Sequence, residues 1–313
     1  MPNYNILVSD GLDERGQSIL RASAKLDLRD KVPAEELLKI IPDYDALIVR
    51  GQTRVTAAVI EAASQLKVIG RAGVGVDNID LESAKKHKIT VVNTPTSTTV
   101  AVAELSLGLL LALAREIPRA DATMKQGQWN KKEFEGVELY GKILGIVGYG
   151  RIGIEVGKRA AAFGMNVIVY DPNVSEDELS HSDAEPVSIQ DLFAWSDFIS
   201  LHLPLNVQTR DLVGPLALSQ MKDGVRIVCA ARGGIIDESA LVDALNSGKV
   251  ARAALDVFEK EPPGLTELVS HPRVIATPHI GAQTVEAQSR ASEDVANEVL
   301  SALRGEALRW KVA

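Results

Sequence analysis

Ten short apolar runs, each followed by a stretch of helical character, constrain the fold of this chain more than any other feature. Most of the runs are continuously apolar, as strands covered on both faces must be. The alternation of such strands with helices predicts parallel sheets in an α/β fold. The expected strands are Ile6–Val8, Ala46–Val49, Val68–Ile69, Thr90–Val92, Ile143–Val147, Val167–Tyr170, Phe198–Leu201, Arg226–Cys229, Ala253–Asp256 and Val274–Ala276.

The fifth expected strand runs directly into a glycine-rich turn. Gly148, Gly150 and Gly153 form the pattern G-x-G-x-x-G, and a helical pattern follows them. In this context Gly148 permits a tight turn, Gly150 admits a pyrophosphate close to the backbone, and Gly153 lets helix and strand pack closely. The start of the helix offers free N–H groups to phosphates. Alone, the pattern is weak, because glycines at such turns are often structural.

Asp171 supplies the second half of a dinucleotide signature. It follows the next expected strand, 18 residues after Gly153, where a carboxylate can accept both ribose hydroxyls. The alternative is a turn aspartate before Pro172. No lysine or arginine occurs from Asp171 through Thr209 to hold a 2′-phosphate, so we expect NAD as the cofactor in preference to NADP.

The length of 313 residues exceeds the usual size of one hydrophobic core, so two domains are expected. Thr98 and Thr99 can cap a long apolar helix, and a last helical pattern follows Gly281. We therefore expect a Rossmann-type NAD-binding domain over residues 99–282. Residues 1–98 with 283–313 would form a substrate-binding domain. The predicted fold is α/β, with two Rossmann-like or flavodoxin-like parallel-sheet domains and a cleft between them.

Composition and charge exclude several classes of protein. The net charge of −8 gives no general attraction to nucleic acid or anionic lipid. The most apolar run, Val100 to Ala114, is interrupted by Glu104 and is shorter than the ~20 residues that span a bilayer. The N-terminus has no signal-peptide pattern, and the single cysteine, Cys229, suits a reducing compartment. We expect a soluble, cytoplasmic protein without nucleic-acid or membrane partners.

Further short motifs extend over nearly the whole chain. They are Gly70–Asp80, Asn93–Pro95, Leu201–Pro204, Ala231–Glu238, Ala254–Glu259 with Glu261–Pro263, and Thr277–Ala282. In content and order they resemble the motifs of D-isomer-specific 2-hydroxyacid dehydrogenases. The resemblance is closest to the D-3-phosphoglycerate dehydrogenase branch, through Arg71–Asp80 and Gly136–Gly153. Because the sequence stops at Ala313, it resembles a short form without the regulatory domain of many such enzymes.

Oxidation of a 2-hydroxy acid needs a base for the hydroxyl proton and a cation for the carboxylate. Histidine suits the first task, and both His202 and His279 follow expected strands, where open α/β sheets place their sites. The resemblance selects His279 as the acid/base, Glu261 as the carboxylate that orients it, and Arg232 as the forked cation. The alternatives are a histidine bonded to backbone, a solvated loop glutamate and a surface arginine.

The resemblance also implies the residues around the cofactor and the substrate. Asp256 would hold the nicotinamide carboxamide. His202 would bind the cofactor, from a loop that lines it, and is more structural than catalytic. Cys229, Leu203 and Val74 replace side chains that are usually polar in this branch, so side-chain bonds to ligand are not expected there. The further cofactor-binding residues are Arg151, Ile152, Pro172, Pro204, Ala230, Ala231, Gly281 and Ala282, and the substrate-binding residues are Arg50, Gly51, Gly73, Val74 and Gly75.

The glycines of the substrate loops can form a carboxylate nest. Lys131 and Lys132 either add charge toward a phosphate, as from the neighbouring subunit in related dimers, or lie in a solvated turn; the two interpretations are evenly matched. No metal is expected. Family likeness implies a homodimer.

The resulting hypothesis is NAD-dependent oxidation of a D-2-hydroxy acid, with 3-phosphoglycerate converted to 3-phosphohydroxypyruvate in serine biosynthesis. Glyoxylate or hydroxypyruvate reduction and a D-lactate-type activity stay open. Glu261 argues against formate oxidation, where related enzymes carry glutamine and no hydroxyl proton is removed. A non-catalytic, NAD-sensing corepressor is the alternative from another class. A purely structural α/β protein would leave the glycine and Asp171 signals unexplained.

Overall fold

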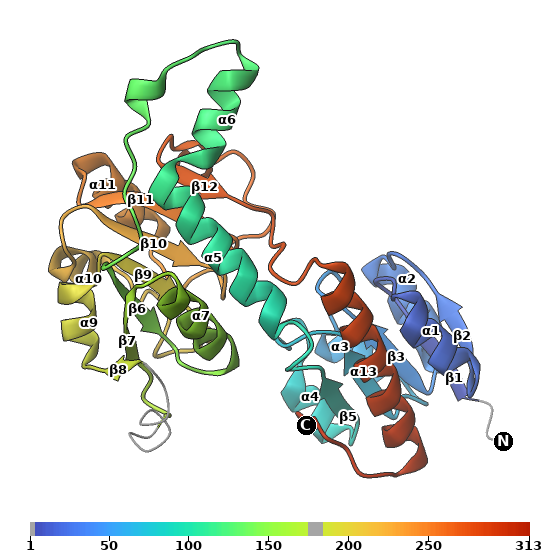
Figure 1. Cartoon of the computed structure of the whole chain (residues 1–313). Helices are drawn as coiled ribbons and strands as arrows, with labels where there is room; N and C mark the ends of the chain where they lie inside the picture. The colour runs from blue at the N-terminus through green and yellow to red at the C-terminus, as the bar shows by residue number, and fades with distance from the viewer. Residues whose placement is uncertain (1–3, 175–183) are drawn as a thin grey trace. The chain divides into compact units, whose positions relative to one another are not determined.

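The computed structural model describes residues 4–174 and 184–313 and separates into two compact units. Unit 1 consists of Met1–Thr99 with Ala282–Ala313, and unit 2 is the continuous stretch Val100–Gly281. Each unit is built on its own parallel sheet with helices around it (Figure 1). The predicted fold class of two parallel-sheet α/β domains is therefore confirmed.

Unit 1 contains a five-stranded parallel sheet in the order β2-β1-β3-β4-β5. The last helix of the chain belongs to this unit, because it packs on α1, β4 and β5. The elements are β1 (Tyr4–Val8), α1 (Glu14–Arg21), β2 (Ala24–Leu28), α2 (Ala34–Ile40), the 3-10 turn η1 (Ile41–Asp43), β3 (Ala46–Val49), α3 (Ala57–Ala62), β4 (Val68–Arg71), α4 (Leu81–Lys86), β5 (Thr90–Asn93) and α13 (Val285–Arg304).

Two apolar layers cover the faces of this sheet. On one face α1 and α13 contribute Leu20, Val295 and Val299 to a cluster with Ile6 and Ile48. On the other face α2, α3 and α4 pack against alternate residues of the same strands. Burial on both faces explains why these strands read as continuous apolar runs.

Unit 2 contains a seven-stranded parallel sheet in the order β12-β11-β10-β9-β6-β7-β8. Its elements are α5 (Thr99–Arg115), α6 (Ile117–Lys125), η2 (Lys131–Glu133), β6 (Ile143–Val147), α7 (Arg151–Ala162), β7 (Asn166–Tyr170), β8 (Glu185–Pro186), α9 (Ile189–Trp195), β9 (Phe198–Leu201), α10 (Pro215–Gln220), β10 (Val225–Cys229), α11 (Glu238–Ser247), β11 (Val250–Leu255), α12 (Glu267–Ser270) and β12 (Val274–Ala276).

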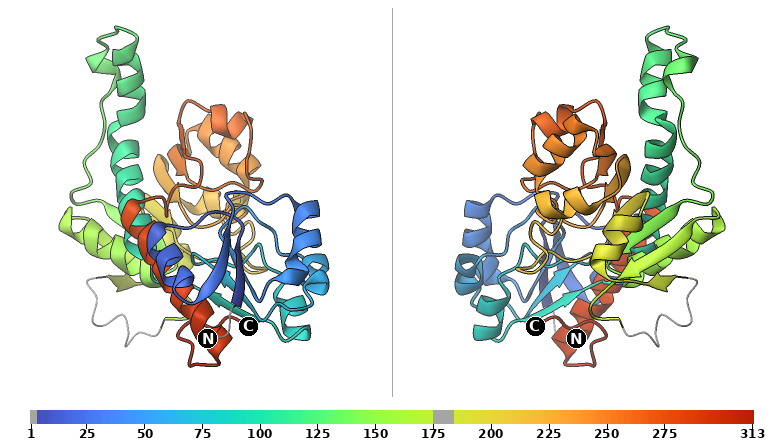
Figure 2. Two further views of the ribbon diagram at one scale, coloured as in Figure 1. Left: turned by 90° about the vertical axis from the view of Figure 1, so that its right-hand side faces the viewer. Right: turned by 90° about the vertical axis from the view of Figure 1, so that its left-hand side faces the viewer.

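Helices cover both faces of this second sheet as well. Helices α5 and α7 pack on one face, and α9 to α12 pack on the other. Helix α6 and the segment after it instead project beyond the sheet, and α6 buries none of its residues (Figures 1 and 2). The apolar run from Val100 to Ala114 thus forms a core helix. No helix among residues 4–174 and 184–313 is long and apolar enough to cross a membrane.

All ten expected strands occur, and two further strands of the described residues were missed. Both lie at a sheet edge: β2 alternates apolar residues with Lys25 and Asp27, and β8 is only two residues long. These two strands give no apolar run to detect, because β2 carries charges and β8 is very short, whereas the apolar edge strands β5 and β12 were found. The expected strand Ala253–Asp256 starts at Val250 and ends at Leu255, which leaves Asp256 in the loop that follows.

Candidate active site

The expected site residues of unit 2 lie at or just after the carboxyl ends of its parallel strands. The glycine turn follows β6, Asp171 and Pro172 follow β7, His202 and Pro204 follow β9, and Ala230 to Arg232 follow β10. Asp256 and Glu261 come after β11, and His279 and Gly281 come after β12. Parallel strands bring all these loops to one edge of the sheet, where open α/β sheets bind their ligands.

The glycine turn is shaped to hold a dinucleotide. Gly148 has φ +92°, and a Cβ on it would lie 2.4 Å from the carbonyl oxygen of His202. A Cβ on Gly153 would lie 2.2 Å from the carbonyl oxygen of Gly148, so these two glycines are required by the packing of the turn. A Cβ on Gly150 would meet nothing within 4 Å. Gly150 therefore leaves open space at the start of α7.

Helix α7 begins beside that open space without a side-chain cap. Gly150 is its N-cap residue and Arg151 and Ile152 are its first residues, so their N–H groups have no partner within the helix. Free N–H groups with the positive end of a helix dipole suit a pyrophosphate. The turn and helix start fit the phosphates of NAD.

Asp171 lies next to the glycine turn. One carboxylate oxygen accepts the N–H of Tyr149 at 2.9 Å, and the other accepts the N–H of Asn173 at 2.9 Å. The side-chain amide of the exposed Asn173 also donates to this second oxygen, at 3.4 Å. A carboxylate has about four acceptor positions, so one remains free, and a second becomes free if the Asn173 amide turns away. This arrangement fits a carboxylate that holds ribose hydroxyls, while Pro172 beside it is exposed.

His279 and Glu261 form a hydrogen-bonded pair. Nδ1 of His279 lies 2.7 Å from Oε2 of Glu261, and Oε1 of Glu261 accepts the N–H of Phe258 at 3.1 Å. Burial alone would raise the pKa of Glu261. The hydrogen bond and charge of His279, the Phe258 N–H and the charge of Arg232 together hold that pKa below its usual range. Because an ionised carboxylate only accepts, Nδ1 carries a proton and Nε2 of the half-exposed imidazole is left to accept one.

Arg232 belongs to the same group of side chains. Its charge acts on Glu261, and its guanidinium donates to the carbonyl oxygen of Ala231 at 2.7 Å. The next residue, Gly233, contacts the backbone of Phe258 so closely that a Cβ would lie 1.9 Å from the Phe258 oxygen. The loop after β10 is thereby held against the loop that carries Glu261, and the three expected catalytic residues are brought together.

Cys229 and Asp256 lie beneath these loops. Burial raises the pKa of the Cys229 thiol to about 11, so the thiol stays protonated. Asp256 is 1% exposed and bonds to the segment that carries His279. Gly281, which contacts Asp256, is the last residue of unit 2. The chain enters unit 1 again at Ala282.

His202 has a structural environment. Nε2 lies 2.7 Å from Oγ of Ser200, Nδ1 is buried without a hydrogen-bond partner, and burial lowers the pKa of the imidazole to about 4. The ring is therefore neutral at physiological pH, which does not suit a residue that exchanges protons there.

This burial predicts a pH-dependent stability. Between about pH 6.5 and about pH 4 the unfolded chain protonates His202 and the folded chain does not, so stability should fall as the pH drops through this window, by about 3 kcal/mol in all. Urea unfolding without cofactor at several pH values measures it. The curve of His202→Gln should be flatter between pH 6.5 and pH 5, and parallel curves would contradict the assignment.

In unit 1 the expected substrate residues also follow strands of the sheet. Arg50 and Gly51 come directly after β3, and Gly73, Val74 and Gly75 come after β4. Burial lowers the pKa of Arg50, while Asp10 counteracts this. The carboxylate of Asp10 accepts the N–H groups of Arg50, Gln52 and Thr53 and so fixes this loop.

The sequence reasoning did not select Asp10 or Arg71. Arg71 ends β4 opposite Val49 of β3, and its guanidinium lies against Gly73. It therefore adds a second cation at the edge where Arg50 follows β3. Both residues stand at or just after the carboxyl end of an apolar strand. This position in the sequence was the signal that could have selected them. Arg50 itself was selected by resemblance and not by this position.

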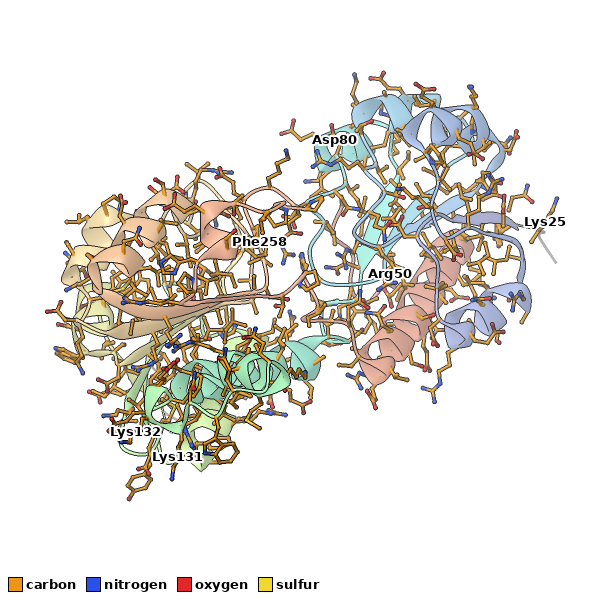
Figure 3. The ribbon with its side chains drawn as sticks, turned by 90° about the horizontal axis from the view of Figure 1, so that it is seen from above. Lys25, Arg50, Asp80, Lys131, Lys132 and Phe258 are labelled. Carbon is orange, nitrogen blue, oxygen red and sulfur yellow. The ribbon has the colours of Figure 1, made fainter. Side chains whose placement is uncertain are left out.

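Lys131 and Lys132 lie side by side on the projecting segment of unit 2 (Figure 3). Both are exposed. Among the described residues, 4–174 and 184–313, no group of three or more His, Cys, Asp or Glu side chains is placed to hold a metal ion.

Comparisons with known proteins identify the family of this chain. The profile described as D-isomer specific 2-hydroxyacid dehydrogenase, NAD binding domain, matches residues 107–281. Hydroxypyruvate reductase of Thermotoga maritima is 48% identical over 307 residues, which are 97% of this chain and 99% of the relative. The chain belongs to the D-isomer-specific 2-hydroxyacid dehydrogenase family.

Other members of the family differ in length and in named substrate. D-3-phosphoglycerate dehydrogenase of Methanocaldococcus jannaschii is 50% identical over 302 residues, but these are 96% of this chain and 58% of the relative. The chain thus spans a little over half the length of the phosphoglycerate dehydrogenases it matches. Among solved structures, D-lactate dehydrogenase from Aquifex aeolicus, complexed with NAD and lactic acid, superposes with a TM-score of 0.83 at 30% identity and 96% coverage of both chains.

Two expectations are confirmed by these relationships. The family that the sequence motifs predicted is the family of this chain. Residues 107–281 of unit 2 form the family's NAD-binding domain, so NAD is the cofactor. A small hydroxy acid is the kind of substrate that the family name describes.

Proposed function

We propose that the chain oxidises a D-2-hydroxy acid with NAD, and that its substrate is 3-phosphoglycerate. The observation that carries the reaction type is the 2.7 Å pair of His279 and Glu261, at the edge of the NAD-binding sheet and beside Arg232. We assign NAD binding to residues 99–282 and substrate binding to residues 1–98 with 283–313.

The His279–Glu261 pair gives the reaction its proton path. Glu261 accepts a hydrogen bond from the Nδ1–H group, so Nε2 of His279 can take the proton of the substrate hydroxyl. The imidazolium that forms remains beside a carboxylate that stabilises it. NAD, when bound, accepts the hydride. In the reverse direction His279 returns the proton to the carbonyl oxygen, so one pair serves oxidation and reduction.

Each unit carries cations that can bind an anion. Arg232 can bond the carboxylate and the adjacent oxygen through its fork. We assign Arg50, Gly51 and the Gly73–Gly75 loop to the substrate as well. Two arginines, Arg50 and Arg71, at the ends of adjacent strands favour a substrate with a second anionic group, which is the support for a phosphorylated acid.

A panel of D-2-hydroxy acids tests the substrate. Initial rates of NADH formation would be measured with 3-phosphoglycerate, glycerate, lactate and 2-hydroxyglutarate under the same conditions. We expect the largest kcat/KM for 3-phosphoglycerate. A preference for glycerate over its phosphorylated form would contradict the phosphate assignment. Absence of turnover with every acid, in either direction, would favour an NAD-sensing binding protein.

Hydroxypyruvate reduction is the second candidate. It is favoured by the Thermotoga maritima relative, since that protein matches this chain over 99% of its own length. Oxidation of NADH with hydroxypyruvate and with glyoxylate distinguishes this activity. A kcat/KM for hydroxypyruvate above that for 3-phosphohydroxypyruvate would establish it.

Asp171 should set the preference for NAD. Replacing Asp171 by alanine removes a charged acceptor for the ribose hydroxyls, so the affinity for NADH should fall roughly 10- to 100-fold. The affinity for NADPH should change far less, because loss of the carboxylate also removes its repulsion of the 2′-phosphate. Fluorescence titrations with both cofactors measure the two effects. Asn173→Ala, which leaves the carboxylate in place, is the control, and equal weakening of both cofactors would contradict the account.

We also propose that the chain works as a homodimer in the cytoplasm. Exposed apolar side chains on the projecting segment support the dimer: Ile117 and Met124 are 53% exposed and Trp129 is 78% exposed. A hollow lined by Leu111, Val137, Tyr140 and Phe163 lies on the same unit. Sedimentation equilibrium tests this assembly, and a monomer at micromolar concentration would refute it. The buried free thiol of Cys229 is compatible with a reducing compartment.

A further inference from the structure

The backbone at His279 has a conformation that histidine rarely adopts. Its φ is +54°, in the left-handed region, where a side chain with a Cβ is disfavoured. Such a residue keeps this conformation only when its surroundings hold it. The bond from Nδ1 to Glu261 fixes the ring, but it does not fix the chain on either side of the residue.

The N–H of His279 donates to the carbonyl oxygen of Thr277 at 3.0 Å, and Asp256 supplies the further support of this turn. Its Oδ1 accepts the hydroxyl of Thr277 at 2.6 Å and the N–H of Ile280 at 2.8 Å, and its Oδ2 accepts the N–H of Gly281 at 2.8 Å. These donors stand on both sides of His279. Asp256 is itself anchored, because it is 1% exposed and its N–H donates to the carbonyl oxygen of Cys229 at 2.9 Å.

We propose that Asp256 and Thr277 are positioning residues for His279. The buried carboxylate of Asp256 holds the turn around His279 by hydrogen bonds, and the Thr277 hydroxyl donates one of these bonds. The turn thereby keeps Nε2 of His279 in a fixed position. This inference rests on the proposed function of His279 as the acid/base. Charge-assisted bonds to a buried carboxylate are strong enough to hold a disfavoured backbone conformation.

The positioning role is separable from the cofactor contact expected for Asp256. Three of about four acceptor positions on the carboxylate are taken by its own chain, which leaves one on Oδ2 for a nicotinamide amide. Substitution of Asp256 would remove both functions at once. Substitution of Thr277 removes one donor to Oδ1 and leaves the free position of Oδ2 unchanged, so Thr277 is the residue to vary.

The test compares Thr277→Val with Thr277→Ser. Valine keeps the shape of threonine and loses the hydroxyl, whereas serine keeps the hydroxyl. We expect valine to lower kcat about 10- to 100-fold, since small displacements of a catalytic group have effects of this size, and to leave the affinity for NADH within about twofold. Serine should restore kcat to near the wild-type value. Thr277→Ala replaces valine if the latter does not fold.

Three results would overturn the proposal: wild-type kcat in the valine variant, equal impairment by serine and valine, or a loss of NADH affinity that matches the loss of kcat. A measurement that needs no turnover, the NMR spectrum of the histidine rings, tests the positioning role independently of the proposed function. The ring signals of His279, assigned by their absence from His279→Asn, should shift and broaden in Thr277→Val but not in Thr277→Ser. Unchanged signals would refute the positioning role even if no acid in the panel is oxidised.

Discussion

Replacing His279 by alanine should lower kcat by about two to four orders of magnitude while the affinity for NADH stays nearly unchanged. In the proposed reaction the imidazole takes the hydroxyl proton. Its side chain bonds to Glu261 at 2.7 Å, so its removal should leave the glycine turn and Asp171 intact. Steady-state rates and NADH fluorescence titrations measure the two quantities.

A matched control is available in the same unit. His271 is partly exposed, precedes Pro272 and contacts Asn246, and His271→Ala should retain normal rates. Turnover of His279→Ala within a few-fold of the wild type would remove this histidine as the acid/base. A parallel loss of NADH affinity would mean that the turn after β12 serves the cofactor.

Replacing Arg232 by lysine should lower kcat/KM roughly 100-fold, although the charge is kept. A guanidinium presents two parallel donors to a carboxylate, and an ammonium group cannot reproduce that geometry. The lost charged hydrogen bonds account for a decrease of this size. Steady-state kinetics with the best acid of the panel measure it.

The control for this change is Arg273→Lys. Arg273 immediately precedes β12, at the opposite edge of the same sheet, and donates to the carbonyl oxygen of Leu245. Its replacement should leave kcat/KM close to the wild-type value. If Arg232→Lys were equally harmless, a single positive charge would suffice for the substrate and the forked contact would be wrong.

The fold was largely predictable because buried parallel strands are visible in the sequence as continuous apolar runs. Val68, Ile69 and their counterparts are apolar in succession, whereas the edge strand β2 carries Lys25 and Asp27 and resembles a surface loop. Local pattern thus finds apolar strands, including the edge strands β5 and β12, and misses strands that are very short or carry charges.

The sequence proposed residues for the site but not their geometry. His279 and Glu261 were selected by resemblance, but their pairing depends on a loop of unit 2 that no local pattern describes. The left-handed conformation of His279 and the convergence of Thr277, Ile280 and Gly281 on Asp256 were not foreseen. They arise from contacts made only after β11 and β12 lie side by side.

The return of α13 to the first sheet has a consequence for biosynthesis. Residues 100–281 form one uninterrupted segment, so unit 2 has its complete sequence before the ribosome reaches Val285. One face of the five-stranded sheet needs Ala291, Val295 and Val299 to cover it, and these residues are made only after all of unit 2. We therefore expect nascent chains to carry an uncovered apolar face until α13 has been made, and a chaperone could act on this face during that time.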